Sequence, residues 1–197
     1  SYKPDDLLIA RVAWSPDGRA VVFQALNREQ TYLDLNAADS ATGKVTKLLT
    51  ETTPTFVNVY GNPEFLKDGT AVWQSARNGW KHLYLYGNDG QMIRQLTSGK
   101  WEVRTLYGVD EKNGWVYFSA TKDSPIAENV YRVRLTGGAP ERLTQDNGWH
   151  IASFDPTFEH FVDIWSDAAT PQQARLYRAD GTLERVVNAN RVDELAQ

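Results

Sequence analysis

Few residues of this chain could carry hydrolytic or metal chemistry. It has no cysteine and three histidines, His82, His150 and His160. A nucleophilic site needs a serine, threonine or cysteine held against a base that a third group orients, and the sequence has no Gly-x-Ser-x-Gly turn. The histidines also lack the spacing of a His-Glu-x-x-His zinc site. We therefore expect structural or surface histidines, and predict no catalytic residue, no metal ligand and no cofactor.

Carboxylate pairs could support acid–base chemistry only if the fold brought them together. Asp5-Asp6 and Asp110-Glu111 are adjacent in sequence, but both lie in hydrophilic, turn-like surroundings. We expect them to be solvated. No glycine-rich loop follows a strand and opens a helix, so nothing indicates a phosphate site.

Aromatic side chains are frequent, with seven tryptophans and nine tyrosines. Such rings can stack on sugars or bases, but most of these lie in strand-like runs, which favours core packing. The rings in question are Trp14, Trp73, Tyr84, Trp115, Tyr117, Tyr131 and Trp165. A net charge of −4 with scattered Lys and Arg argues against a nucleic-acid surface. No apolar run approaches the length of about 20 residues that a membrane-spanning helix needs.

The elements that would position these residues are set by an internal repeat. Leu49, Leu96 and Leu143 close similar short segments 47 residues apart, and Val187 follows 44 residues later. Two sets of turns keep the same period. The first set contains Ser15-Pro16-Asp17-Gly18, Leu66-Lys67-Asp68-Gly69, Glu111-Lys112-Asn113-Gly114 and Asp155-Pro156-Thr157-Phe158; the second is marked by Gly43, Gly90, Gly138 and Gly181. Three sets of similar segments that recur with about the same period indicate a repeat architecture.

Between the turns, β-branched and aromatic residues alternate over strand lengths, at residues 20–25, 70–75, 115–119 and 161–165. Third strands are predicted at 32–35, 83–86, 130–133 and 175–177. Four short strands per unit predict an all-β fold, a β-propeller fragment of about four blades with four antiparallel strands each. The whole of 1–197 is assigned to it, with blades at roughly 7–50, 62–98, 103–145 and 150–188 and an exit segment at 189–197.

The segment 52–62 is longer than a link between blades needs to be, and it contains Phe56-Val57-Asn58-Val59-Tyr60. Two interpretations stay open from the residues alone. It is either a buried strand or a rim loop that contacts a ligand.

The chain resembles the propeller domain of the dipeptidyl peptidase IV family of prolyl-oligopeptidase-like serine peptidases. The resemblance covers nearly the whole chain. Its most specific motif is Gly99-Lys100-Trp101-Glu102-Val103, directly after a blade-closing Leu-Thr. It is also carried by Ser15-Pro16-Asp17-Gly18, Phe65-Leu66-Lys67-Asp68-Gly69, the segment 77–86, Glu128-Asn129-Val130-Tyr131 and Asn188-Ala189-Asn190.

The resemblance implies the second half of an eight-bladed propeller that caps an α/β-hydrolase domain and acts on peptides. The family releases N-terminal dipeptides that have proline or alanine second. The resemblance further implies that the catalytic Ser, Asp and His lie beyond Gln197, and that the acidic pair holding the substrate amine lies in the first half of the propeller. Tyr60 is the residue matched to a substrate-lining aromatic, in a loop less basic than the family's pattern.

Three functions follow as hypotheses. The first is a non-catalytic propeller portion of a dipeptidyl peptidase IV-like enzyme, which gates access to the active site and supports the hydrolase domain. The second is a free-standing propeller that serves as an interaction module, and the third is a propeller that hydrolyses its substrate through carboxylates or a metal in its channel. The chain starts at Ser1 without an initiator Met, which we interpret as an excised or processed piece. The resemblance places the parent in the periplasm or outside the cell, and we expect the piece to self-associate through exposed strand edges.

Overall fold

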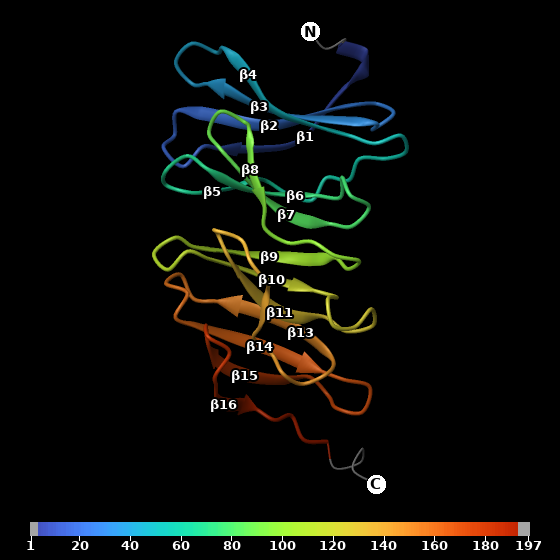
Figure 1. Ribbon diagram of the computed structural model, residues 1–197, viewed down its shortest axis with the longest axis vertical. Coiled ribbons are helices and arrows are strands. Elements are labelled where there is room, and N and C mark those ends of the chain that lie inside the picture. Colours follow the sequence, from blue (N-terminus) through green and yellow to red (C-terminus); the bar gives the residue numbers. More distant parts are fainter. Residues whose placement is uncertain (1–3, 193–197) are drawn as a thin grey trace. The chain divides into compact units, whose positions relative to one another are not determined.

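The fold is all-β in the computed structural model, which describes residues 4–192 (Figure 1). A short 3-10 helix, η1 (Pro4–Asp6), precedes the first strand, and sixteen strands follow in the described residues. They form four separate sheets of four strands each. We number these sheets 1 to 4 in chain order.

The strands of each sheet are consecutive in the sequence. Sheet 1 contains β1 (Leu7–Trp14), β2 (Ala20–Asn27), β3 (Tyr32–Asp39) and β4 (Val45–Thr52). Sheet 2 contains β5 (Glu64–Phe65), β6 (Ala71–Ser75), β7 (His82–Tyr86) and β8 (Met92–Gln95). Sheet 3 contains β9 (Val103–Asp110), β10 (Trp115–Ala120), β11 (Asn129–Arg134) and β12 (Glu141–Arg142). Sheet 4 contains β13 (Trp149–Phe154), β14 (His160–Ser166), β15 (Gln173–Arg178) and β16 (Leu183–Asn188).

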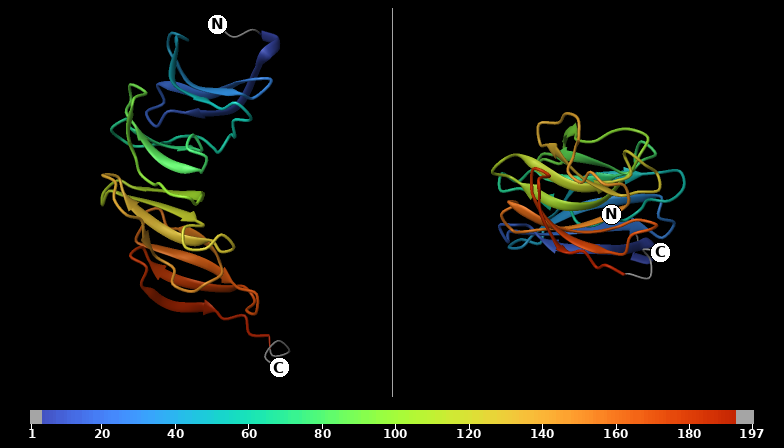
Figure 2. Two further views of the ribbon diagram at one scale, coloured as in Figure 1. Left: turned by 45° about the vertical axis from the view of Figure 1, so that its right-hand side comes forward. Right: turned by 90° about the horizontal axis from the view of Figure 1, so that it is seen from below.

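Every strand pairs antiparallel with its sequence neighbour, so each sheet is a simple meander. The course of each sheet from strand to strand can be followed in Figure 2. This arrangement confirms the predicted fold class, four four-stranded antiparallel sheets of a partial β-propeller. The chain divides between Gln95 and Leu96 into two compact units, with sheets 1 and 2 in the first and sheets 3 and 4 in the second.

Aspartates close turns of the first predicted set. The carboxylate of Asp68 accepts hydrogen bonds from the backbone N–H and the hydroxyl of Thr70, at 2.9 and 2.7 Å. Asp155 is bonded in the same way by Thr157. In each case the hydroxyl is the main cause that lowers the pKa of the aspartate. These turns are Asx turns, which hold the hairpin through the side chain as well as the backbone.

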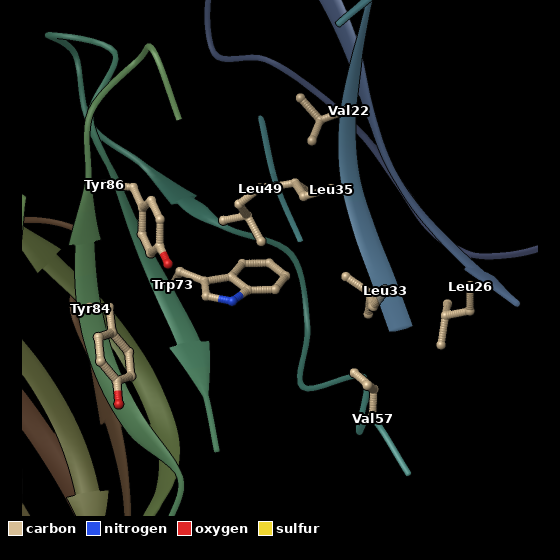
Figure 3. Close-up of a cluster of buried hydrophobic side chains, with 9 residues drawn as sticks. All are labelled: Val22, Leu26, Leu33, Leu35, Leu49, Val57, Trp73, Tyr84 and Tyr86. Carbon is tan, nitrogen blue, oxygen red and sulfur yellow. The ribbon is translucent and has the colours of Figure 1, made fainter. Parts of the chain in front are cut away.

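The core of the first unit lies between sheets 1 and 2. Trp73 of β6 lies beside Leu49 of β4 and Leu33 of β3 in Figure 3. The apolar residues of this cluster alternate along their strands, so within each sheet they lie on one face. The cluster consists of Val22, Leu26, Leu33, Leu35, Leu49, Val57, Trp73, Tyr84 and Tyr86.

The core of the second unit is more aromatic. Phe161 of β14 stacks on Tyr177 of β15, with ring centroids 5.1 Å apart, and on Phe154 of β13 at 4.8 Å. Tyr117 of β10 lies 4.6 Å from Phe154 and 5.3 Å from Phe158. Offset ring contacts of this kind add to the free energy gained by burial.

Burial confirms the core prediction for six of the seven aromatic residues and contradicts it for one. Trp14 at the end of β1 is 64% exposed, whereas Trp73, Tyr84, Trp115, Tyr117, Tyr131 and Trp165 are buried. Trp14 pairs with Val21, next to Val22, which enters the core. Adjacent strand residues point to opposite faces, so Trp14 lies on the face of sheet 1 that turns away from the core of its unit.

A glycine turn contacts the neighbouring sheet in each unit. Gly90, in the turn between β7 and β8, lies against the backbone of Leu48 in β4, and a Cβ built on Gly90 would stand 1.9 Å from the Leu48 carbonyl oxygen. Gly181, between β15 and β16, meets the backbone of Leu143 in the same way, at 2.8 Å. Both glycines also have positive φ, so glycine is required at these positions by the turn conformation as well as by the close packing.

The end of the predicted exit segment, residues 193–197, lies outside the described residues. None of the helices in the described part of the chain is long and apolar enough to cross a membrane.

We predict that Gly90→Ala destabilises the first unit far more than Gly18→Ala does. Both positions have positive φ, at 76° and 69°, so the backbone strain is matched, but nothing lies within 4 Å of a Cβ at Gly18. We expect the free energy of unfolding, measured by urea denaturation, to fall by about 2 kcal/mol more for Gly90→Ala. Equal losses in the two variants would contradict the role of Gly90 in sheet packing.

Candidate functional site

The candidate site is a hollow of about 230 Å³ in the first unit. One wall is the loop between β4 and β5, which carries Tyr60, and the other is the loop between β6 and β7. The lining includes aromatic, amide, carboxylate and guanidinium groups from Phe56, Tyr60, Asn58, Glu51 and Arg77. A pocket with an apolar wall and a few polar groups is the usual form of a ligand site.

The loop that carries Tyr60 is not a strand. Residues 53–63 have no strand pairing, and among residues 53–60 only Val57 is buried. The buried-strand interpretation is therefore wrong, and the segment is a loop. Hydrogen bonds to sheet 1 explain its position, because the Thr53 N–H donates to the Thr31 carbonyl and the Val57 N–H donates to the Gln30 carbonyl, at 3.0 and 2.7 Å.

Two contacts fix the position of Tyr60 in the loop. The Gly61 carbonyl accepts a hydrogen bond from the buried Gln24 side chain at 2.5 Å. The Lys81 ammonium lies 4.9 Å from the centre of the Tyr60 ring, within range of a cation–π contact. Tyr60 is half-buried, so part of the ring remains available to a ligand.

A buried carboxylate organises the floor of the hollow. Glu51 Oε1 accepts a hydrogen bond from the Trp73 indole at 2.9 Å, and Oε2 accepts one from the Ser75 hydroxyl at 2.8 Å. The Arg77 guanidinium forms an ion pair with Glu51 and donates to the Tyr86 hydroxyl. These contacts join β4, β6, β7 and the loop after β6 into one polar network.

Arg77 keeps its charge in this network. Burial is the largest single effect and acts against the charged guanidinium, but the Glu51 carboxylate and the Tyr86 hydroxyl together raise the pKa of Arg77. The same guanidinium lies 4.6 Å from the ring centre of Tyr84 and 5.6 Å from that of Tyr86. Because it is fixed on several sides, Arg77 presents a stationary positive charge at the hollow.

The hollow can bind but has no groups arranged for catalysis. Its one serine, Ser75, donates to Glu51 and accepts from the Arg77 Nε at 3.0 Å. No histidine lines it. The Ser75 hydroxyl does contact a carboxylate, but Glu51 is already engaged by the Arg77 guanidinium and the Trp73 indole. The aromatic rings, the Asn58 amide and the cation remain for contacts with a ligand.

A buried histidine–aspartate pair in the second unit escaped the sequence analysis. His150 Nδ1 lies 2.7 Å from Asp163 Oδ2, and both side chains are fully buried. His150 Nε2 faces the Asp146 carbonyl at 3.0 Å. Both ring nitrogens therefore face oxygen atoms of the second unit, and the buried ring is closed off from solvent. The alternation of residues within β13 and β14 predicts that His150 and Asp163 point to the buried face of sheet 4. No residue pattern in the sequence indicates that these two side chains contact each other.

Two more acidic residues of the second unit are buried. Glu128 pairs with the Ser119 hydroxyl. Asp110, expected to be solvated, is buried and accepts hydrogen bonds from the backbone and side chain of Asn113, at 3.1 and 2.7 Å. The expectation for Asp110 was wrong because its turn folds back over the carboxylate.

The remaining histidines agree with the structural or surface assignment. His82 in β7 is buried, and His160 is partly exposed near Asp155 and Glu184. Within residues 4–192, no group of three or more acidic or histidine side chains is placed to hold a metal ion.

Comparison with known proteins identifies a family. The family model described as "Dipeptidyl peptidase IV (DPP IV) N-terminal region" matches residues 1–172. Dipeptidyl peptidase 4 of Arthroderma otae is 29% identical over 189 residues, which cover 88% of this chain and 23% of the relative. Inactive dipeptidyl peptidase 10 of Mus musculus is 28% identical over 179 residues, 82% of this chain and 22% of the relative.

A solved structure gives the same result. The crystal structure of Porphyromonas gingivalis dipeptidyl peptidase 4 matches with a TM-score of 0.87 and 28% identity, over 93% of this chain and 26% of that one. The chain thus spans about a quarter of the length of the relatives it matches.

We predict that Glu51→Gln loosens the floor of the hollow. A glutamine keeps the shape but replaces one acceptor oxygen with a donor, which leaves the Arg77 charge uncompensated. We expect the free energy of unfolding to fall by about 2 kcal/mol and Trp73 fluorescence to shift in the native state. The exposed Glu29→Gln removes the same charge and should leave both readouts unchanged. A Glu51→Gln protein indistinguishable from the wild type would show that the network does not support the site.

Proposed function

The chain belongs to the family of the dipeptidyl peptidase IV N-terminal region, and from that membership we propose that it is a non-catalytic propeller portion of a serine exopeptidase. In this proposal the parent releases N-terminal dipeptides whose second residue is proline or alanine. The chain shapes access to the active site and supports an α/β-hydrolase domain supplied by the rest of the polypeptide. The supporting observation is a family match over residues 1–172 together with a hollow suited to binding but not to catalysis.

The non-catalytic role is also supported by the kinds of relative that match. A dipeptidyl peptidase 4 and an inactive dipeptidyl peptidase 10 are nearly equally similar to this chain, at 29% and 28% identity. If this region carried the reacting groups, the active and inactive relatives should differ in their likeness to it. The similarity is better explained by a shared scaffold.

Tyr60 is the residue that we propose for contact with the peptide substrate. Its ring stands at the edge of a hollow that also presents the Arg77 guanidinium and the Asn58 amide. An aromatic face with fixed polar neighbours can orient a peptide by stacking and hydrogen bonding. In the parent this hollow would form the outer part of the substrate site.

The surfaces of the end sheets support the proposed domain partners. Ile9, Val12 and Trp14 of sheet 1 and Ile151 and Val162 of sheet 4 are exposed apolar residues. Apolar patches of this kind mark interaction surfaces, and we assign them to contacts with the first half of an eight-bladed propeller. We further propose that the parent acts in the periplasm or outside the cell.

An interaction module without peptidase activity is the second candidate. The match to inactive dipeptidyl peptidase 10 favours this candidate, because a protein named as inactive is similar to this chain over 82% of its residues. The sequence that flanks this chain in its parent polypeptide would distinguish the two candidates. Only the peptidase requires a hydrolase domain with a Gly-x-Ser-x-Gly motif.

We expect this chain alone to release no chromophore from a glycyl-prolyl p-nitroanilide substrate above the buffer rate. The parent polypeptide, extended through its hydrolase domain, should turn the substrate over. Turnover by the isolated chain would overturn the non-catalytic assignment, and an inactive parent with an intact Gly-x-Ser-x-Gly motif would overturn the peptidase assignment.

In the active parent, Tyr60→Ala should raise KM for a longer peptide substrate by about 3- to 10-fold, the value of one aromatic contact, with kcat changed less. Trp80→Ala removes an exposed aromatic that does not line the hollow, so it is the control. Equal effects of the two substitutions on KM would argue that Tyr60 does not contact the substrate.

A further inference from the structure

Three asparagine–glycine pairs occur in the chain, and a tryptophan follows each of them. They are Asn78-Gly79-Trp80, Asn113-Gly114-Trp115 and Asn147-Gly148-Trp149. Asparagine is chemically labile, and it is most labile before glycine, because a residue without a Cβ lets its backbone nitrogen approach the asparagine side chain. Since the three local sequences are matched, the fold decides which pair can react.

Hydrogen bonds hold the reacting groups of the first two pairs. In Asn78-Gly79 the glycine N–H donates to the Ala76 carbonyl at 2.8 Å, and the asparagine Nδ2 donates to the Tyr84 hydroxyl at 3.3 Å. Asn113 donates to both carboxylate oxygens of Asp110, from its Nδ2 at 2.7 Å and from its backbone N–H at 3.1 Å. Each of these pairs must break hydrogen bonds before the reacting atoms can meet.

The third pair is free of such contacts. Asn147 is exposed in the loop between β12 and β13, and with Gly148 it lines a surface groove of about 650 Å³. Within residues 4–192, the Asn147 side chain makes no hydrogen bond and the Gly148 N–H donates none. The side-chain carbonyl carbon and the backbone nitrogen are therefore both available, and the groove admits water.

We propose that Asn147 is a site of spontaneous deamidation. The Gly148 nitrogen attacks Asn147 Cγ to form a cyclic succinimide, and the side-chain amide leaves with the Gly148 proton as ammonia. Water then opens the ring at one of its two carbonyls, which gives aspartate or isoaspartate at this position. One water is consumed and one ammonia is released, so the reaction needs no oxidant and no other co-reactant.

The modified loop is held mainly through its backbone carbonyls. The Arg142 guanidinium donates to the carbonyls of Gln145 and Asp146, at 3.0 and 2.9 Å. The Asn147 carbonyl accepts a hydrogen bond from the Trp165 indole at 3.1 Å. These contacts depend on the spacing of consecutive carbonyls, so a change in the length of the backbone would disrupt them.

Gly148 leaves no room for a longer backbone. A Cβ built on it would stand 2.4 Å from the Ser166 carbonyl oxygen and 2.8 Å from the Trp165 indole nitrogen. Isoaspartate routes the backbone through its Cβ and so adds a methylene directly before Gly148. We expect this product to break the carbonyl contacts of the loop and to destabilise the second unit, whereas aspartate changes only the charge.

The first test compares the three pairs within one molecule. The folded chain is incubated at mildly alkaline pH and digested with trypsin, which cleaves after Arg77, Lys112 and Arg142 and so separates the pairs into different peptides. Mass spectrometry should show Asn147 converted about tenfold faster than Asn113 or more, because the hydrogen bonds of Asn113 must break first. An aliquot that is not incubated corrects for conversion during digestion.

Unfolding in urea is the control for the role of the fold. The local hydrogen bonds are lost there, and each pair has the same following residue, so the three rates should converge. Two results would overturn the proposal. One is a folded protein in which Asn78 or Asn113 reacts as fast as Asn147, and the other is a preference for Asn147 that persists unchanged in urea.

The second test measures the consequence. Asn147→Gln keeps an amide but places its carbonyl carbon one methylene further from the Gly148 nitrogen, which slows ring closure. After incubation, the wild type should contain a fraction that unfolds at lower urea concentration, and Asn147→Gln should not. Asn78→Gln is the matched control and should behave like the wild type. Equal losses of stability in Asn147→Gln and the wild type would refute the role of Asn147.

Discussion

The close approach of backbones at Gly90 and Gly181 is the constraint on which the packing of each unit depends. A side chain at either position would overlap the carbonyl of Leu48 or Leu143, so the sheets can reach their packing distance only with glycine there. That distance lets Trp73 lie against Leu49 and lets Tyr117 of sheet 3 contact the ring of Phe154 in sheet 4. The repeat period seen in the sequence is thus the spacing of a packing contact as well as of a turn.

The packing of sheet 1 against sheet 2 also holds the candidate site in place. Val57 joins the core between sheets 1 and 2, and Glu51 ties together strands from both. Tyr60 therefore belongs to a long loop whose ends are fixed by backbone hydrogen bonds and by a buried carboxylate network. A loop of this kind can present a side chain accurately without regular secondary structure.

The sequence was sufficient for the fold, but it left the segment 52–62 open between a strand and a loop and did not predict the polar interior. Alternation and turn residues predict strands because both depend on neighbouring residues, and the third strand at Tyr32 or Leu83 follows from them. The His150–Asp163 pair joins two strands through their side chains, and the burial of Asp110 depends on how its turn folds. Trp14 could not be placed either, because its exposure depends on whether another sheet covers the outer face of sheet 1.

The meander topology of the sheets has a consequence for how the polypeptide acquires its structure. Every strand pairs with its neighbour in sequence, so each sheet closes only short loops and has the low contact order that is unusual for β proteins. Once the residues of one sheet have left the ribosome, all the strands that pair within that sheet are available. The sheets can therefore form one after another during synthesis, and each new glycine turn arrives when the strand it packs against is already in place.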